Sequence, residues 1–174
     1  MKLKNVLLLI SSIFIIIGIT LKTSNQYHSY LINKKEKKAI TNFINKQKSE
    51  YIAIIEIPQI NLKKGIREDD NVDKGIMLLD KDKVINDTFI LAAHSGNCEV
   101  CYFNHLDELK NKDIIYFYYN KMKYTFEIIK IERKRKLTFT LQNEVNTITL
   151  ITCEKDNDDY QIIIIGNLIS KEKY

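Results

Sequence analysis

The pattern of hydrophobic and polar positions divides the chain into three stretches. Residues 6–21 read VLLLISSIFIIIGITL, a run without a single charge. Residues 31–49 are rich in lysine and repeat apolar side chains at nearly helical spacing. From Tyr51 onward, β-branched and aromatic runs alternate with polar turns, which is typical of strands. The chain therefore predicts two helical segments followed by a β domain.

The apolar run is the candidate membrane segment. It is shorter than the ~20 residues of a usual transmembrane helix but close to the lower limit of about 17. Lys2, Lys4 and Lys22 flank it, and no small-residue cleavage site follows it, so an uncleaved signal anchor fits better than a removed signal peptide. We predict a transmembrane helix over residues 1–22. A Lys-rich stalk follows over residues 23–50, either as a helix or as a solvated linker.

Six runs after Tyr51 are predicted strands, and one stretch among them, NHLDELK at residues 104–110, looks helical. The predicted strands are Tyr51–Ile57, Thr88–Ala93, Asp113–Tyr119, Lys123–Glu132, Thr147–Thr152 and Tyr160–Ile169. Strands this dense favour an all-β fold, a closed or nearly closed β-barrel with small helices. Residues 51–174 are enough for one ordinary hydrophobic core, so we predict a single domain there.

The net charge of +5 is unevenly distributed. Residues 1–50 hold nine Lys and two Glu, whereas residues 51–174 hold 18 basic and 20 acidic side chains. The positive charge thus belongs to the predicted anchor and stalk, where it suits anionic lipid or wall polymer. A mildly acidic domain argues against binding of nucleic acid through a broad basic face.

Two arrangements of side chains in the β domain are candidates for chemistry. The first pairs His94 with Cys153, each at the end of a predicted strand, because a histidine can activate a thiol. A structural cysteine and an unrelated loop histidine are the simpler alternative. The second is the run of His94, Cys98, Cys101 and His105, whose spacing fits a zinc site or a CxxC disulfide.

For the CxxC motif we expect unpaired thiols. Zinc needs both histidines in one compact loop, and His105 lies in the stretch predicted to be helical. A membrane-tethered CxxC thiol redox protein is an alternative, but the thioredoxin-like fold that it would resemble has a proline after the motif. The single proline here, Pro58, precedes it. We predict no cofactor and no metal.

Several segments, in order along residues 51–174, resemble those of the sortases, membrane-anchored cysteine transpeptidases of Gram-positive bacteria. The similar segments are AIIEIPQI (53–60), FILAAHS (89–95), YFNHLDEL (102–109), TITLITC (147–153) and GNL (166–168). The resemblance implies a closed sortase-type barrel of about eight strands, with His94 and Cys153 as the catalytic pair. It is closer to the class D, A or B sortases than to the pilus-polymerising ones.

One position departs from the family's pattern. Counting back from Gly166, the position at which the family has a catalytic arginine is occupied by Gln161. An amide donates hydrogen bonds without charge, and charged donors are roughly twice as strong. We therefore name Gln161 as the third catalytic candidate. Backbone N–H groups, or Arg133 or Arg135 on a neighbouring predicted strand, are candidates to compensate for the missing charge.

The resemblance also implies a function. Cys153 would cleave an LPXTG-like sorting signal through a thioacyl-enzyme and attach the surface protein to a cell-wall peptide amine, with His94 transferring protons. The expected protein is a single-pass protein of the cell membrane with an extracellular catalytic domain. Its partners would be sorting signals, the wall amine and membrane lipid, with no nucleic acid. The alternative is a catalytically degenerate sortase-like domain that binds surface peptides, and Gln161 is its marker.

Overall fold

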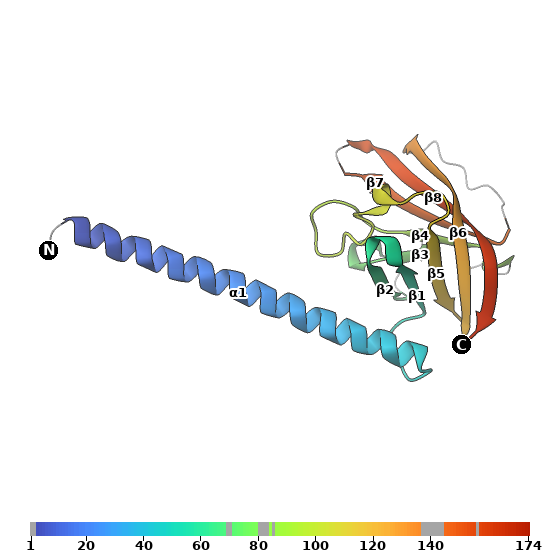
Figure 1. Cartoon of the computed structure of the whole chain (residues 1–174), viewed down its shortest axis with the longest axis horizontal. Helices are drawn as coiled ribbons and strands as arrows, with labels where there is room; N and C mark the ends of the chain where they lie inside the picture. The colour runs from blue at the N-terminus through green and yellow to red at the C-terminus, as the bar shows by residue number, and fades with distance from the viewer. Residues whose placement is uncertain (1–2, 69–70, 80–83, 85, 137–144, 156) are drawn as a thin grey trace. The chain divides into compact units, whose positions relative to one another are not determined.

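The computed structural model describes residues 3–68, 71–79, 84, 86–136, 145–155 and 157–174, without the side chains of residues 3–9, 25 and 158. The chain divides into two compact units, Met1–Lys38 and Ala39–Tyr174. Figure 1 shows a long helix and a strongly curved β-sheet as their main elements. The two units are described in turn.

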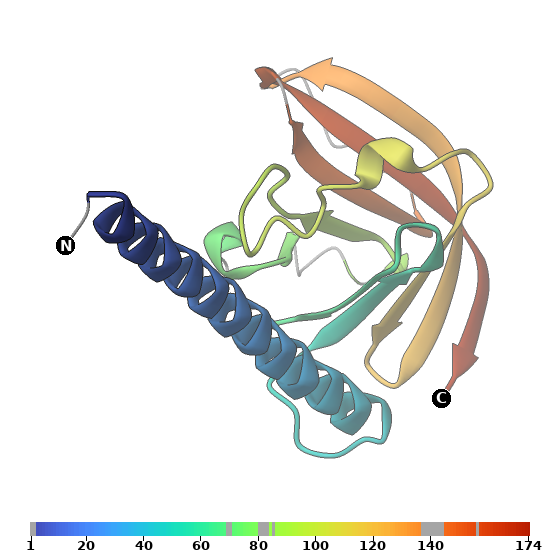
Figure 2. The same ribbon diagram turned by 60° about the vertical axis from the view of Figure 1, so that its left-hand side comes forward.

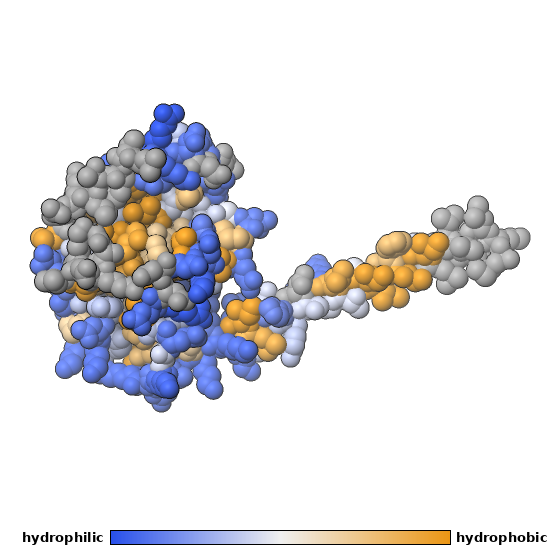
Figure 3. Space-filling view, turned by 180° about the vertical axis from the view of Figure 1, so that it is seen from behind, coloured by the Kyte–Doolittle hydropathy of each residue, from blue (hydrophilic) through white to orange (hydrophobic). Residues whose placement is uncertain are grey.

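Helix α1 (Leu3–Ile44) is continuous over 42 residues and runs through the segments that the sequence analysis separated as anchor and stalk. Apolar side chains between Ile10 and Leu21 are 47–70 % exposed, and they form the apolar part of α1 in Figure 3. The first residues of the span predicted over residues 1–22, up to residue 9, have side chains that lie outside the described part of the chain. In the part that is described, no helix combines the length and the apolar composition needed to cross a membrane.

The described strands form one sheet of eight, in the order β2-β1-β5-β6-β8-β7-β4-β3. They are β1 (Ala53–Ile57), β2 (Leu62–Ile66), β3 (Met77–Leu79), β4 (Phe89–Ala92), β5 (Ile114–Tyr119), β6 (Met122–Arg135), β7 (Thr147–Glu154) and β8 (Asn157–Lys173). The sheet curls until it is nearly closed (Figures 1 and 2). The predicted all-β barrel of about eight strands is thereby confirmed.

Short 3-10 helices occupy some of the connections. They are η1 (Pro58–Ile60), η2 (Val72–Lys74) and η4 (Leu106–Glu108). The helix expected over residues 104–110 is therefore only the three-residue turn η4. Strands β2 and β3, at the two edges of the sheet, were missed by the sequence analysis.

Strand alternation separates the barrel core from the outer face of the sheet. On β4 and β7, the side chains of Phe89, Leu91, Ile148 and Leu150 belong to the core and are at most 1 % exposed. Phe89 is central, with its ring centroid 4.5 Å from that of Phe117. Burial of each such side chain contributes about 1.5–3 kcal/mol to folding. Because successive side chains point to opposite faces, the residues between them face away from this core.

A second cluster joins the C-terminal end of α1 to the barrel. Ile40, Tyr51 and Ile54 are buried together, and Phe43 packs against them. Gly65 on β2 permits this packing, since a Cβ atom there would lie 2.3 Å from the Tyr51 ring. The end of the helix within the second unit is therefore part of the folded domain.

Candidate active site

Strands β4 and β7 are parallel neighbours, and their register brings His94 and Cys153 together. The register pairs Phe89 with Ile148 and continues to Ala92 with Ile151. Continued past the end of β4, the same offset sets His94 beside Cys153. Leu91 and Leu150 point into the core, so the alternation along each strand turns His94 and Cys153 to the outer face of the sheet. Their side chains therefore share one face at the C-terminal ends of two adjacent strands.

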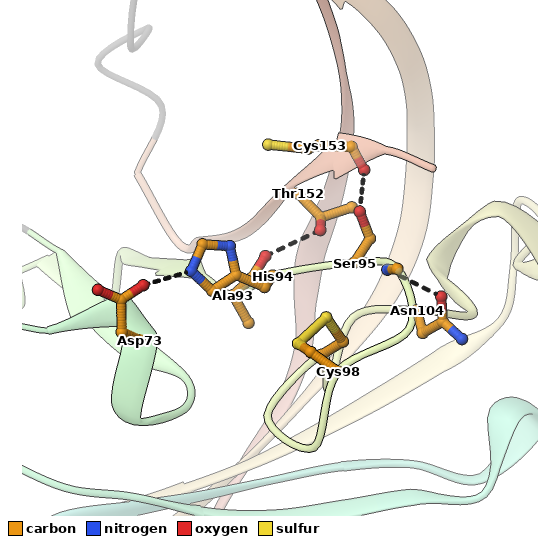
Figure 4. The surroundings of a disulfide bond; sticks show 10 residues. Asp73, Ala93, His94, Ser95, Cys98, Asn104, Thr152 and Cys153 are labelled. Carbon is orange, nitrogen blue, oxygen red and sulfur yellow. Dashed lines mark hydrogen bonds and ion pairs between the residues drawn. A yellow bond between two sulfur atoms is a disulfide. The ribbon is translucent and has the colours of Figure 1, made fainter. Parts of the chain in front are cut away.

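Two hydrogen bonds hold these strand ends against each other. The hydroxyl of Thr152 donates to the Ala93 carbonyl at 2.8 Å across 59 residues of sequence, and Thr152 is buried. On the other side of the pair, the Ser95 hydroxyl donates to the Cys153 carbonyl. One of these hydrogen bonds thus lies before the pair of His94 and Cys153, and the other starts from the residue that follows His94 (Figure 4).

Asp73 is a site residue that the sequence analysis missed. Its Oδ1 lies 2.8 Å from Nε2 of His94. Figure 4 shows the carboxylate on the side of the imidazole ring away from Cys153. Because a carboxylate only accepts hydrogen bonds, Nε2 carries the proton and Nδ1 is left for other contacts. The sole local signal is the turn in which the Asn71 side chain accepts from the Asp73 N–H at 2.8 Å, and such turns are common.

Gln161 lies directly opposite Cys153 in the antiparallel pair of β7 and β8. Residues directly opposite in such a pair present their side chains on the same face. The half-buried side chains of Cys153 and Gln161 therefore share the outer face with His94. The third candidate named from the sequence is thus next to Cys153 and on the same face as His94, and its role remains a prediction.

Neither arginine proposed to supply charge beside Gln161 faces this site. On β6, Arg133 is paired with Ile162 and Arg135 with Tyr160, whereas Lys134 between them is paired with Gln161. Because successive side chains point to opposite faces, both arginines face away from Gln161. Arg133 makes two 2.7 Å bonds to the Glu154 carboxylate and stacks on a β8 tyrosine ring at 3.8 Å. Its hydrogen bonds lower the pKa of Glu154. The expectation that Arg133 or Arg135 compensates is wrong, because strand alternation directs them to the other face.

The cysteines of the CxxC motif form a disulfide. Cys98 and Cys101 are bonded to each other, which corrects the expectation of unpaired thiols and occupies both sulfurs that a zinc site would use. Within the described ranges no group of three or more potential metal ligands is present. His105 Nδ1 instead pairs with Glu108 at 2.5 Å. The free thiol is that of Cys153.

The disulfide lies in the loop that leaves His94. This loop is closed at its base by the bond from the Phe103 N–H to the His94 carbonyl at 3.1 Å, so it returns to the strand end where it started. A second bond, from the Gly96 N–H to the side chain of Asn104 at 3.1 Å, ties the loop to the residue after Phe103. The arrangement holds a free, half-buried thiol beside an imidazole, at two strand ends that are hydrogen-bonded to each other. Such a pair can perform nucleophilic acyl transfer.

The sequence of residues 55–169 matches the family model of the Sortase domain. The chain belongs to the sortase family. The match covers more than half of the chain and includes His94, Cys153 and Gln161.

Solved sortases have the same fold. Listeria monocytogenes sortase A is 20% identical with a TM-score of 0.63, and the likeness covers 72% of this chain and 92% of that one. Streptococcus pneumoniae sortase C is 24% identical with a TM-score of 0.60, over 71% and 69% of the two chains. The pilus-related sortase C of Group B Streptococcus is 24% identical with a TM-score of 0.62, over 71% and 70%. At these identities the likeness establishes the fold alone.

One curated sequence also matches. It is a Plasmodium falciparum protein whose name assigns it to the E3 ubiquitin-protein ligases, and it is 27% identical over 114 residues. The match covers 65% of this sortase but 1% of the parasite protein. Nothing about the parasite protein's activity carries over to this chain.

Asp73→Asn is expected to slow the alkylation of Cys153 by iodoacetamide at neutral pH, by up to about fivefold. The Asp73 carboxylate accepts a hydrogen bond from Nε2 of His94 and so orients the imidazole ring, and a well-oriented histidine is better placed to activate a thiol. The effect is limited because Asp73 is 78 % exposed and exposed ion pairs contribute at most about 1 kcal/mol.

The rate is measured by intact mass. Asp87→Asn is the matched control, since Asp87 pairs with Lys171 and precedes the other end of β4. Equal rates for the wild type and the Asp73 variant would mean that Asp73 is only a surface partner of His94.

Proposed function

We propose that this sortase is a membrane-anchored cysteine transpeptidase. It cleaves an LPXTG-like sorting signal through a thioacyl-enzyme on Cys153 and attaches the surface protein to a cell-wall amine. The observation that carries the proposal is the shared register of His94 and Cys153 across β4 and β7. Membership of the sortase family supports the reaction class.

The reaction has two half-reactions. The Cys153 thiolate attacks the carbonyl carbon of the scissile Thr–Gly amide, which forms a C–S bond and moves the carbonyl electron pair onto oxygen. When this tetrahedral species collapses, the C–N bond breaks and the imidazolium of His94 gives its proton to the leaving amine. In the second half, His94 takes a proton from the acceptor amine. The amine nitrogen bonds to the thioester carbon, and Cys153 leaves as the thiolate.

The hydrogen bonds between the ends of β4 and β7 support a preorganised site. Thr152 and Ser95 bond across β4 and β7 on either side of the reacting pair. Small displacements of catalytic groups are costly in rate, and these bonds resist them. Gln161, opposite Cys153, donates a neutral hydrogen bond to the carbonyl oxygen in this proposal.

The proposed location is the cell membrane, with one span and an extracellular catalytic domain. The charge-free run at residues 6–21 and its exposed apolar side chains from Ile10 onward support it. Apolar surface of this extent needs a partner. The Lys-rich segment that follows would meet anionic lipid or wall polymer.

A trapping experiment tests the function. The full chain in detergent is incubated with LPXTG-type peptides that vary at X, without an acceptor, and its intact mass is followed. We expect an adduct with the mass of the peptide up to its threonine, which hydroxylamine releases and a peptide amine converts into a ligated product. Cleavage without any adduct, or an adduct on a residue other than Cys153, would contradict the proposal.

The second candidate is a degenerate sortase-like domain that binds surface peptides without cleaving them. The neutral side chain of Gln161 on the face of Cys153 favours it. The same incubation separates the two functions: binding of the peptide with neither an adduct nor cleavage would support the degenerate domain.

A further inference from the structure

A row of four polar side chains crosses the outer face of the sheet. On β8, Gln161 lies opposite Cys153 of β7 and also opposite Lys134 of β6. His94 follows on the other side of Cys153, by the register of β4 and β7. Opposite residues share a face, so Lys134, Gln161, Cys153 and His94 stand side by side. Lys134 is the lysine of this row, at the end away from His94.

The next two rows on the same face are apolar on β8 and charged on β6. Glu132, Ile163 and Ile151 form the adjacent row, and Lys130, Ile165 and Thr149 the one after it. Ile163 is fully buried, and Ile165 and Thr149 are at most 7 % exposed. A positive charge next to these buried side chains is less well screened than one in open water.

The Lys134 ammonium is already held over this face. Its Nζ lies 3.1 Å from Oε2 of Glu132, one row away, and Nζ of Lys130 binds the other carboxylate oxygen at 2.9 Å. Hydrogen bonds from Lys130 and then Lys134 lower the pKa of Glu132. Neighbouring strands are about 4.8 Å apart. A lysine two strands from Cys153 therefore needs only a turn of its flexible stem to reach a substrate atom above Gln161.

We propose that Lys134 donates a hydrogen bond to the scissile carbonyl oxygen as it becomes an oxyanion, and so supplies the charge that Gln161 lacks. This proposal rests on the proposed function and adds a catalytic residue to it. The ammonium keeps its proton throughout, and its role is to stabilise the negative oxygen. Because that charge exists only in the transition state and the tetrahedral species, the contact accelerates the reaction rather than strengthening peptide binding.

Lys134→Met tests the proposal, with Lys130→Met as the matched control. Both variants remove one partner of Glu132, but Lys130 lies opposite Ile165, about 13 Å further along the strand. We expect kcat for cleavage of the LPXTG-type peptide to fall about 10- to 100-fold in Lys134→Met with KM within about twofold. Lys130→Met is expected to stay within about twofold of the wild type. Equal losses in Lys130→Met and Lys134→Met, or none in either, would overturn the proposal.

A rescue experiment separates a catalytic role from a structural one. Gln161→Arg restores a charged donor directly opposite Cys153, so Gln161→Arg combined with Lys134→Met is expected to recover at least about tenfold of the lost kcat. No recovery at an unchanged melting temperature would overturn the role of Lys134. The failure of the proposed function looks different: the wild type itself then forms no acyl adduct, and this proposal falls with it.

Discussion

Cys153→Ala is expected to abolish peptide cleavage, with a loss of about 10⁴-fold or more, and to prevent the thioacyl adduct altogether. The thiolate is the nucleophile in the proposed mechanism, and removal of a covalent nucleophile leaves only binding and oxyanion stabilisation. The substitution spares the local structure, because the Ser95 hydroxyl bonds to the backbone carbonyl of residue 153 and not to its thiol. Cleavage of a fluorogenic LPXTG-type peptide and intact mass both measure the effect.

The control for this variant is the double substitution Cys98→Ser with Cys101→Ser. It removes the disulfide but no nucleophile, so the acyl adduct must still form. The opposite pattern, in which the double variant is inactive and Cys153→Ala is active, would overturn the transpeptidase assignment. It would favour the CxxC thiol redox protein considered from the sequence.

His94→Ala is the second large effect, with an expected fall in kcat/KM of about 10²- to 10⁴-fold. Removal of the imidazole takes away the cation that favours the Cys153 thiolate and the acid that protonates the leaving amine. The loss should therefore appear both in peptide cleavage and in the rate of iodoacetamide alkylation, whereas a loss of leaving-group protonation alone would affect cleavage only.

His105→Ala is the control for His94. His105 lies a short way along the same loop, pairs with Glu108 and has no part in the proposed mechanism. Its activity is expected to stay within about twofold of the wild type. A wild-type rate in His94→Ala would remove the proposed acid and base from the reaction.

The sequence analysis predicted the central strands of the barrel and missed its edges. Strand β1 and strands β4 to β8 carry β-branched and aromatic runs, which were enough to recognise them. Strand β2 reads LKKGI, where lysines suit an exposed edge strand but hide its apolar pattern. Strand β3 has three residues, too few for a period of two to be visible. Both belong to the sheet because a neighbouring strand supplies their hydrogen bonds.

The helical stretch after the CxxC motif shows the same limit. Residues 104–110 have helical composition, but only η4 forms there. The loop leaving His94 is instead closed by the Cys98–Cys101 disulfide and by the bond from Phe103 to the His94 carbonyl. Such tertiary constraints override a helical preference that is weak over so few residues.

The amino-acid sequence alone determined the all-β domain, the uneven charge, and the identities of His94, Cys153 and Gln161 as candidates, because composition, alternation and ordered motifs are local properties. Only the tertiary structure decided which residues share a face. A register shift of one residue would turn every side chain of a strand to the opposite face. The observed pairings set Gln161 and Lys134 in the row of Cys153 and direct Arg133 to Glu154 instead. Register depends on contacts between strands far apart in the chain, and which charged residue shares a row with Cys153 depends on the register.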